Sequence, residues 1–165
     1  MLAYTKSMRF FVTATPAPEP KTKNVKTISS FLAGVFVVMV VAQLFSYEHF
    51  PDVMSLFFNS SQLVLVVAAC IVTLEVAAIP FLLRMQLSPA ARYVSMVAGW
   101  LVALFWLIVS LGAAATWGTY DNAGFLGDTV TLLGGWWAVF FSLGLVVLAV
   151  WASWGMWPGS RPNKR

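Results

Sequence analysis

The sequence predicts an all-α membrane protein whose four transmembrane helices form an antiparallel bundle with both termini in the cytoplasm. Three observations support this fold class. Of the 165 residues, 60% are hydrophobic and only 10% are charged, whereas an ordinary soluble domain carries about 25% charged residues. Four long apolar segments are separated by short polar links. All ten lysines and arginines fall on one side of a four-span arrangement.

The four apolar segments comprise residues 28–45, 62–83, 93–116 and 130–154. Each is close to or above the roughly 20 residues that a helix needs to cross the hydrocarbon core of a bilayer. Because backbone polar groups inside the core must be paired within the segment, we expect each segment to be a helix. The short links place consecutive helices side by side in opposite directions, as in an up-down-up-down bundle.

The distribution of charge predicts the orientation of the bundle. The basic residues lie before the first span, between the second and third spans, and after the fourth: Lys6, Arg9, Lys21, Lys23, Lys26, Arg84, Arg92, Arg161, Lys164 and Arg165. The other two links carry only acids: Glu48, Asp52, Asp121 and Asp128. By the positive-inside rule both termini are therefore cytoplasmic. Basic residues scattered over three membrane-flanking segments do not form a nucleic-acid site, so the lipid bilayer is the expected partner.

Three regions follow from this pattern. Residues 1–27 combine prolines with lysines and are expected to form a flexible, basic cytoplasmic arm. Residues 28–155 form the four-helix transmembrane domain, and residues 156–165 form a basic cytoplasmic tail. With a single cysteine, Cys70, the chain has no internal disulfide framework.

Glu75 is the one ionisable residue well inside a predicted span. It lies nine residues before Arg84, roughly 13 Å from the cytoplasmic end of its helix. A charged side chain at such a depth costs roughly 2.5–3.5 kcal/mol. We therefore expect Glu75 to face the bundle or a cavity, and to be either paired or protonated. Intramembrane carboxyls are functional candidates, and the structural alternative is a carboxyl that links helices by hydrogen bonds.

Candidate partners of Glu75 are the side chains predicted at the same depth on the other spans: Trp100, Trp106 and Ser142. For the two tryptophans, packing within the bundle is the competing role. Gln43 is expected to lie too close to the outer end of its span to reach the carboxyl. Arg84 is expected to extend toward the interface instead of pairing with Glu75 within one helix.

The first outer link contains Glu48, His49 and Asp52, three potential metal ligands within five residues. No paired histidines or cysteines accompany them, and metal sites in proteins usually need a richer set. We expect a capped interfacial loop and no metal. No nucleotide-binding loop or nucleophile motif is present, so the sequence names no catalytic residue.

Two motifs provide a family resemblance: residues 45–51, Phe-Ser-Tyr-Glu-His-Phe-Pro, and residues 74–84, Leu-Glu-Val-Ala-Ala-Ile-Pro-Phe-Leu-Leu-Arg. With four spans over residues 28–155, the chain resembles the DoxX-like superfamily of small membrane proteins, which includes DoxX, DoxD and MauE relatives. The resemblance implies a bacterial plasma membrane, and functional positions at Glu75 and Arg84. Such proteins are linked to quinone-coupled sulfur oxidation or to the maturation of periplasmic redox proteins.

Three functions compete. The first is a DoxX-like, non-catalytic subunit or accessory factor in membrane redox or envelope physiology, with a pocket around Glu75 for a quinone or another lipophile. If it is part of an enzyme, that enzyme is a quinone-linked oxidoreductase. The second is a small transporter or proton relay that uses Glu75. The third is a structural bundle whose outer acidic loops or cytoplasmic arm bind a partner. A homodimer or a larger membrane complex is compatible with each of the three functions.

Overall fold

A computed structural model describes residues 13–55, 57–58 and 60–158. Within these residues the chain forms five helices: α2 (Lys23–Phe45), α3 (Phe50–Ser55), α4 (Ser61–Leu82), α5 (Pro89–Trp117) and α6 (Trp136–Gly155). All except the short α3 are long and apolar enough to cross a membrane. The predicted all-α fold with four membrane-spanning helices is therefore confirmed.

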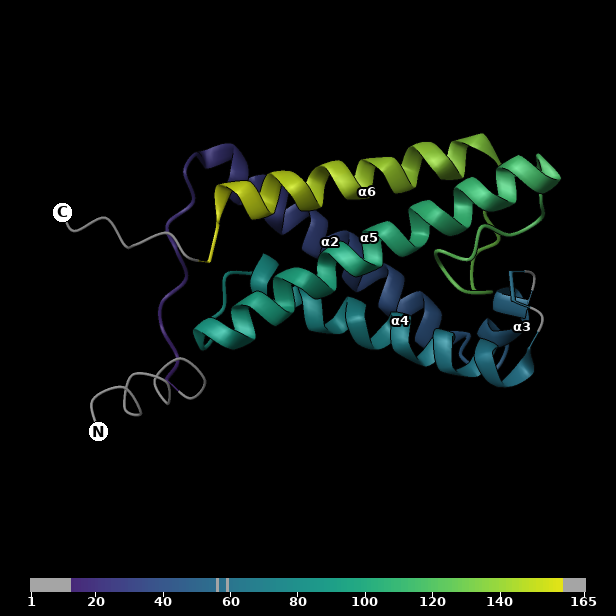
Figure 1. The fold of residues 1–165 in the computed structure, drawn as a ribbon, viewed down its shortest axis with the longest axis horizontal. Coiled ribbons are helices and arrows are strands. Elements are labelled where there is room, and N and C mark those ends of the chain that lie inside the picture. Colours follow the sequence, from purple (N-terminus) through teal and green to yellow (C-terminus); the bar gives the residue numbers. More distant parts are fainter. Residues whose placement is uncertain (1–12, 56, 59, 159–165) are drawn as a thin grey trace.

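The four long helices form one bundle in which consecutive helices run in opposite directions (Figure 1). Helix α2 packs against α4 and α6, and α5 packs against the same two helices. One end of the bundle holds the start of α2, the end of α4, the start of α5 and the end of α6 (Figure 1). We call it the basic end, because Lys23, Arg84 and Arg92 lie there; the opposite, acidic end carries the links that hold Asp52 and Asp121.

The fourth helix begins later than predicted. Its start was expected at residue 130, but α6 begins at Trp136. Residues 118–135 link α5 to α6, and we call them the α5–α6 loop. Backbone groups of the intervening segment form hydrogen bonds with other residues of this loop. In this loop Ala123 N donates to Leu132 O (2.7 Å), and Gly134 N donates to Tyr120 O (2.6 Å). An apolar stretch at the acidic end is therefore folded as loop and not as helix.

The first helix begins earlier than predicted, and the N-terminal arm differs from the expectation. Residues 23–27, assigned to a flexible arm, are the first turns of α2. The helix starts at Lys23 because the Thr22 side chain accepts a hydrogen bond from Val25 N (3.3 Å), which caps an otherwise unpaired amide. Residues 1–12 of the predicted arm and residues 159–165 of the predicted tail lie outside the described residues.

The described part of the arm, residues 13–22, is fixed to the basic end and is not a free segment. The Arg92 guanidinium donates to Thr15 O (2.8 Å) and Pro16 O (3.0 Å). Thr15 N donates to Leu87 O (3.0 Å), just before α5, and Lys21 N donates to Gly155 O (3.2 Å), at the end of α6. Carbonyls near helix ends lack intrahelical partners, so they are available to hold a crossing segment. The arm thus connects α5 to α6.

A serine of α5 repairs the hydrogen bonding of α4 around Pro80. Phe81 N donates to Ser95 Oγ (3.0 Å), and Ser95 Oγ donates to Ala77 O. The hydroxyl therefore stands between two backbone groups that would pair directly in an uninterrupted helix. A proline inside a membrane helix is tolerated when a neighbouring side chain satisfies the freed groups in this way.

The hydrogen bonds of Arg92 predict how the arm responds to mutation. In the full-length protein, Arg92→Ala should release residues 13–22 and make the chain cleavable by trypsin after Lys21. Limited proteolysis followed by mass spectrometry measures this cleavage. Arg84→Ala is the matched control, because it removes the same charge from the basic end without a hydrogen bond to the arm. Equal protection of the Arg92→Ala variant and the parent chain would contradict the assignment.

Candidate functional site

Glu75 is fully buried in the interior of the bundle and joins three helices. Its Oε1 accepts a hydrogen bond from Trp106 Nε1 of α5 (3.1 Å) and another from Gln43 Nε2 of α2 (3.3 Å). Both donors are themselves fully buried. The carboxyl of α4 is thus held by two neutral donors from different helices, which satisfies one of its oxygens in the buried interior. The predicted contact between Glu75 and Trp106 is present.

Gln43 extends this arrangement to the α5–α6 loop. The same Nε2 that donates to Glu75 also donates to Phe125 O (3.0 Å). We call Gln43, Glu75, Trp106 and Phe125 the Glu75 network. Its members come from α2, α4, α5 and the loop, so Glu75 and Gln43 together connect four separate segments of the chain.

The prediction that Gln43 cannot reach Glu75 is wrong. The prediction estimated the depth of each residue from its distance along its own helix. It assumed that the ends of α2 and α4 at the acidic end lie at the same height. In the structure α2 crosses the bundle obliquely (Figure 1), and the short α3 lies between the two helices in sequence and packs against α4. The long side chains of Gln43 and Glu75 cover the remaining separation.

The α5–α6 loop folds into the acidic end of the bundle. Phe125 is only 1% exposed, and its ring centroid lies 4.8 Å from that of Trp106 and 4.8 Å from that of Phe141. Gly124 adopts a φ of 81°, and a Cβ at this position would lie 3.1 Å from Met54 Cε. The left-handed backbone therefore favours glycine, and the Met54 methyl would have to shift by a few tenths of an ångström to admit a side chain.

Two further hydrogen bonds fix the loop to the end of α2. Asp128 N donates to Ser46 Oγ (2.9 Å), and Thr129 Oγ1 donates to Ala42 O (2.7 Å). Both acceptors lie within one turn of Gln43. The position of Phe125 is consequently tied to the same part of α2 that holds Glu75.

Two oxygens of the network have no partner. Glu75 Oε2 and Gln43 Oε1 are both buried and accept no hydrogen bond. Unpaired buried acceptors usually mark a place for a proton, a water molecule or a ligand group. A proton on Oε2 would convert that atom from an acceptor into a donor. The site can therefore take one further proton or one small hydrogen-bond donor.

The other predicted partners of Glu75 lie elsewhere. The prediction that Ser142 lies beside the carboxyl is wrong: Ser142 Oγ donates to Ala138 O (2.6 Å) and lies within hydrogen-bond distance of Ser110 Oγ (3.0 Å). Trp100 Nε1 donates to Ser153 Oγ (2.8 Å) and is not part of the network. Both side chains link α5 to α6. A serine hydroxyl on a helix tends to form a hydrogen bond with the backbone of its own helix or with the nearest facing hydroxyl, and not with a more distant carboxyl.

Arg84 makes no hydrogen bond to Glu75 and ends α4. Its φ of 59° is left-handed, and Met85 N donates to Pro80 O (2.9 Å) while Arg84 N donates to Phe81 O (3.0 Å). This pair of bonds is the Schellman motif, in which glycine is the usual residue. The Nε atom of Arg84 is buried without a partner.

The link between α2 and α4, at the acidic end, contains an exposed contact between a histidine and an aspartate. His49 Nδ1 lies 3.8 Å from Asp52 Oδ2, and both side chains are mostly exposed. Asp52 occupies the first turn of α3, where a negative side chain interacts favourably with the helix dipole. Among the described residues, no group of three or more histidines, cysteines, aspartates and glutamates could hold a metal ion. Glu48 therefore does not complete a ligand set with His49 and Asp52.

An apolar groove of about 510 Å³ lies beside the Glu75 network, between α2, the α5–α6 loop and α6. Its walls consist of Phe31, Gly34, Val35, Val38, Met39, Phe125, Leu126, Leu132 and Phe141. We call it the α2–α6 groove. Phe125 belongs both to this groove and to the Glu75 network, so the two sites share one residue. No atom lies within 4 Å of the position that a Cβ would take at Gly34, so this residue leaves the groove open.

Comparisons with known proteins name no relative: no family model, no curated protein and no solved structure matches this chain. The function must therefore be argued from the geometry.

The network predicts that Glu75 and Gln43 are energetically coupled. Interhelical hydrogen bonds in membrane proteins contribute about 0.6 kcal/mol on average and up to about 1.7 kcal/mol. A double-mutant cycle with Glu75→Leu and Gln43→Leu, measured by reversible unfolding in mixed micelles, should give a coupling free energy in this range. Glu75→Leu combined with Ser142→Ala serves as the control and should be additive. Additive effects of the Glu75 and Gln43 substitutions would refute the network.

Proposed function

We propose that this chain is a DoxX-like multi-pass protein that binds a quinone or another lipophile in the α2–α6 groove. It would act as a non-catalytic subunit or accessory factor in redox or envelope physiology at a bacterial plasma membrane. The observation that carries this proposal is the shared position of Phe125. Its side chain lines the groove, and its carbonyl oxygen accepts the hydrogen bond from Gln43.

The groove has the properties of a site for an apolar ligand. Its nine lining residues are all apolar or glycine, and its volume falls within the roughly 300–1,000 Å³ of small-molecule sites. Phe31 and Val38 on its rim are 61% and 58% exposed. Because both lie on the membrane-spanning α2, the groove opens toward the lipid, and a lipophile can enter it from the bilayer.

The shared residue couples the groove to the carboxyl. A ligand that displaces the ring of Phe125 also shifts the backbone carbonyl that holds Gln43. Gln43 in turn donates to Glu75, so occupancy of the groove changes the hydrogen bonding of a buried carboxyl. This connection favours a ligand whose binding is sensed at Glu75 over a purely structural role for that residue.

A proton relay receives less support. Proton-moving proteins usually contain several buried ionisable groups, whereas Glu75 is the one acid within the four spans. Its Oε1 is held by two neutral donors, and neither of them titrates.

Filling the groove tests the proposal. Gly34→Phe places a ring where the groove is open and should lower the labelling of the full-length protein by a photoreactive quinone analogue in vesicles. We expect a loss of about tenfold or more, which corresponds to roughly 1.4 kcal/mol of binding. Gly112→Phe is the matched control, because Gly112 is also a helical glycine with no atom within 4 Å of its Cβ position. Equal labelling of all three proteins would exclude the groove and favour the structural alternative.

The proposed orientation places the basic end in the cytoplasm. In a Cys70→Ser background, Asp121→Cys should react with a membrane-impermeant maleimide on intact cells. Lys23→Cys should react only after lysis, because it lies at the opposite end of the bundle. Both native side chains are exposed, so the side of the membrane on which each cysteine lies, and not burial within the protein, decides the labelling. The reverse labelling pattern would invert the topology.

A further inference from the structure

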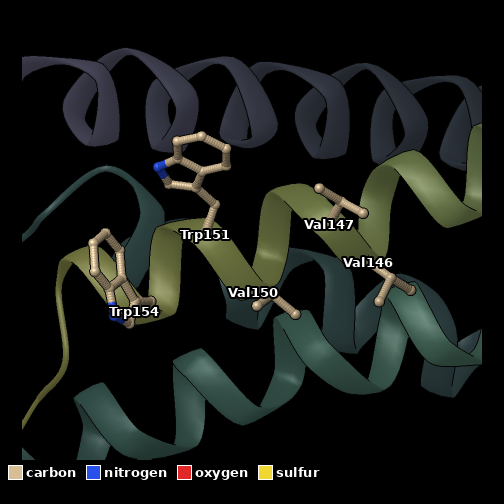
Figure 2. A pocket seen from close by; sticks show the side chains of 5 residues that line it. All are labelled: Val146, Val147, Val150, Trp151 and Trp154. Carbon is tan, nitrogen blue, oxygen red and sulfur yellow. The ribbon is translucent and has the colours of Figure 1, made fainter.

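A second apolar groove lies along α6 and shares no lining residue with the α2–α6 groove. It has a volume of about 470 Å³ and is lined by Val146, Val147, Val150, Trp151 and Trp154 (Figure 2). These residues lie within nine helical positions, 146–154, which extend roughly 12 Å along the axis. Four of them are between 42% and 58% exposed, Val146 being the exception, so the groove faces away from the bundle core. Its length and apolar lining suit an extended hydrocarbon chain.

A cation is held at one end of this groove. The Lys21 Nζ atom lies 4.3 Å from the centroid of the Trp154 ring, in cation–π geometry. The backbone of the same residue is fixed, because Lys21 N donates to Gly155 O (3.2 Å) at the end of α6. An ammonium group therefore stands next to the groove at the basic end, where Trp154 is positioned to lie at the membrane interface.

We propose that this face of α6 binds one anionic phospholipid. An acyl chain would lie along Val147, Val150 and Trp151, and the phosphate would pair with the Lys21 ammonium. This site is separate from the α2–α6 groove, so the inference goes beyond the proposed function.

Charge complementarity favours an anionic phospholipid over the other occupants. Between residues 13 and 26 the chain carries Lys21, Lys23 and Lys26 against the single acid Glu19, a net charge of +2. A zwitterionic lipid would bring its own cation close to these lysines. A second copy of the chain, packed in parallel through α6, would bring its own Lys21 to the same place, and like charges repel.

Native mass spectrometry of the purified full-length protein tests the site. Phosphatidylglycerol and phosphatidylcholine with identical acyl chains are added in parallel. One basic residue near a charged membrane surface contributes enough to bind an anionic lipid about fivefold more tightly. We therefore expect about fivefold greater retention of one phosphatidylglycerol than of phosphatidylcholine.

Three variants separate the site from general surface charge. Lys21→Gln should lower phosphatidylglycerol retention about fivefold and leave phosphatidylcholine retention unchanged. Lys26→Gln removes the same charge from the exposed surface of α2 and should preserve the preference. Lys21→Arg keeps the positive charge and should also preserve the preference for phosphatidylglycerol. Lys21 is an exposed residue, so these substitutions do not disturb the core.

Three outcomes would overturn the proposal. Equal retention of the two lipids by the parent chain shows that no headgroup is selected. An equal loss in the Lys21→Gln and Lys26→Gln variants shows general electrostatic attraction only. A dimer without bound lipid shows that a second copy covers this face. None of these results affects the quinone-labelling experiment, because the two grooves have no residue in common.

Discussion

A carboxyl buried among membrane-spanning helices must be provided with hydrogen-bond donors, and the structure is organised around that requirement. Trp106 and Gln43 supply the donors to Glu75 Oε1 from the helices on either side of α4. Gln43 also binds the carbonyl of Phe125, so the requirement extends to the α5–α6 loop. Apolar packing alone gives helices in lipid little preference for one partner over another. The polar contacts of Glu75 specify which faces of α2, α4 and α5 meet.

Other interhelical hydrogen bonds among the described residues connect two helices each. Ser95 of α5 bridges the backbone of α4 at Pro80, and Trp100 joins α5 to Ser153 of α6. Ser110 and Ser142 form a further link between α5 and α6. These contacts hold neighbouring helices together, whereas the Glu75 network relates three helices and a loop. The groove used in the proposed function lies at the edge of that network, where α2 meets the loop and α6.

Hydropathy sufficed to predict the four spans, because a membrane helix needs about 20 apolar residues and little else. The importance of Glu75 was also visible, since it is the one acid in those spans. The partners were harder to predict. The estimated depth of each residue along its helix correctly predicted Trp106 as a partner of Glu75. The same estimate excluded Gln43, because it assumed that the helix ends lie at the same height and ignored the oblique course of α2. Phe125 carried no polar signal at all, and only the neighbouring glycines 124 and 127, both with positive φ, mark the inward fold of the loop.

The attachment of residues 13–22 has a consequence for how the protein is made. These residues precede α2, whereas their hydrogen-bond partners lie at the start of α5 and at Gly155, the last residue of α6. Its contacts with Leu87 and Arg92 can form once α5 is in place, whereas the contact of Lys21 with Gly155 also requires α6. Full docking of the segment therefore distinguishes a bundle that contains all four long helices from one that lacks α6.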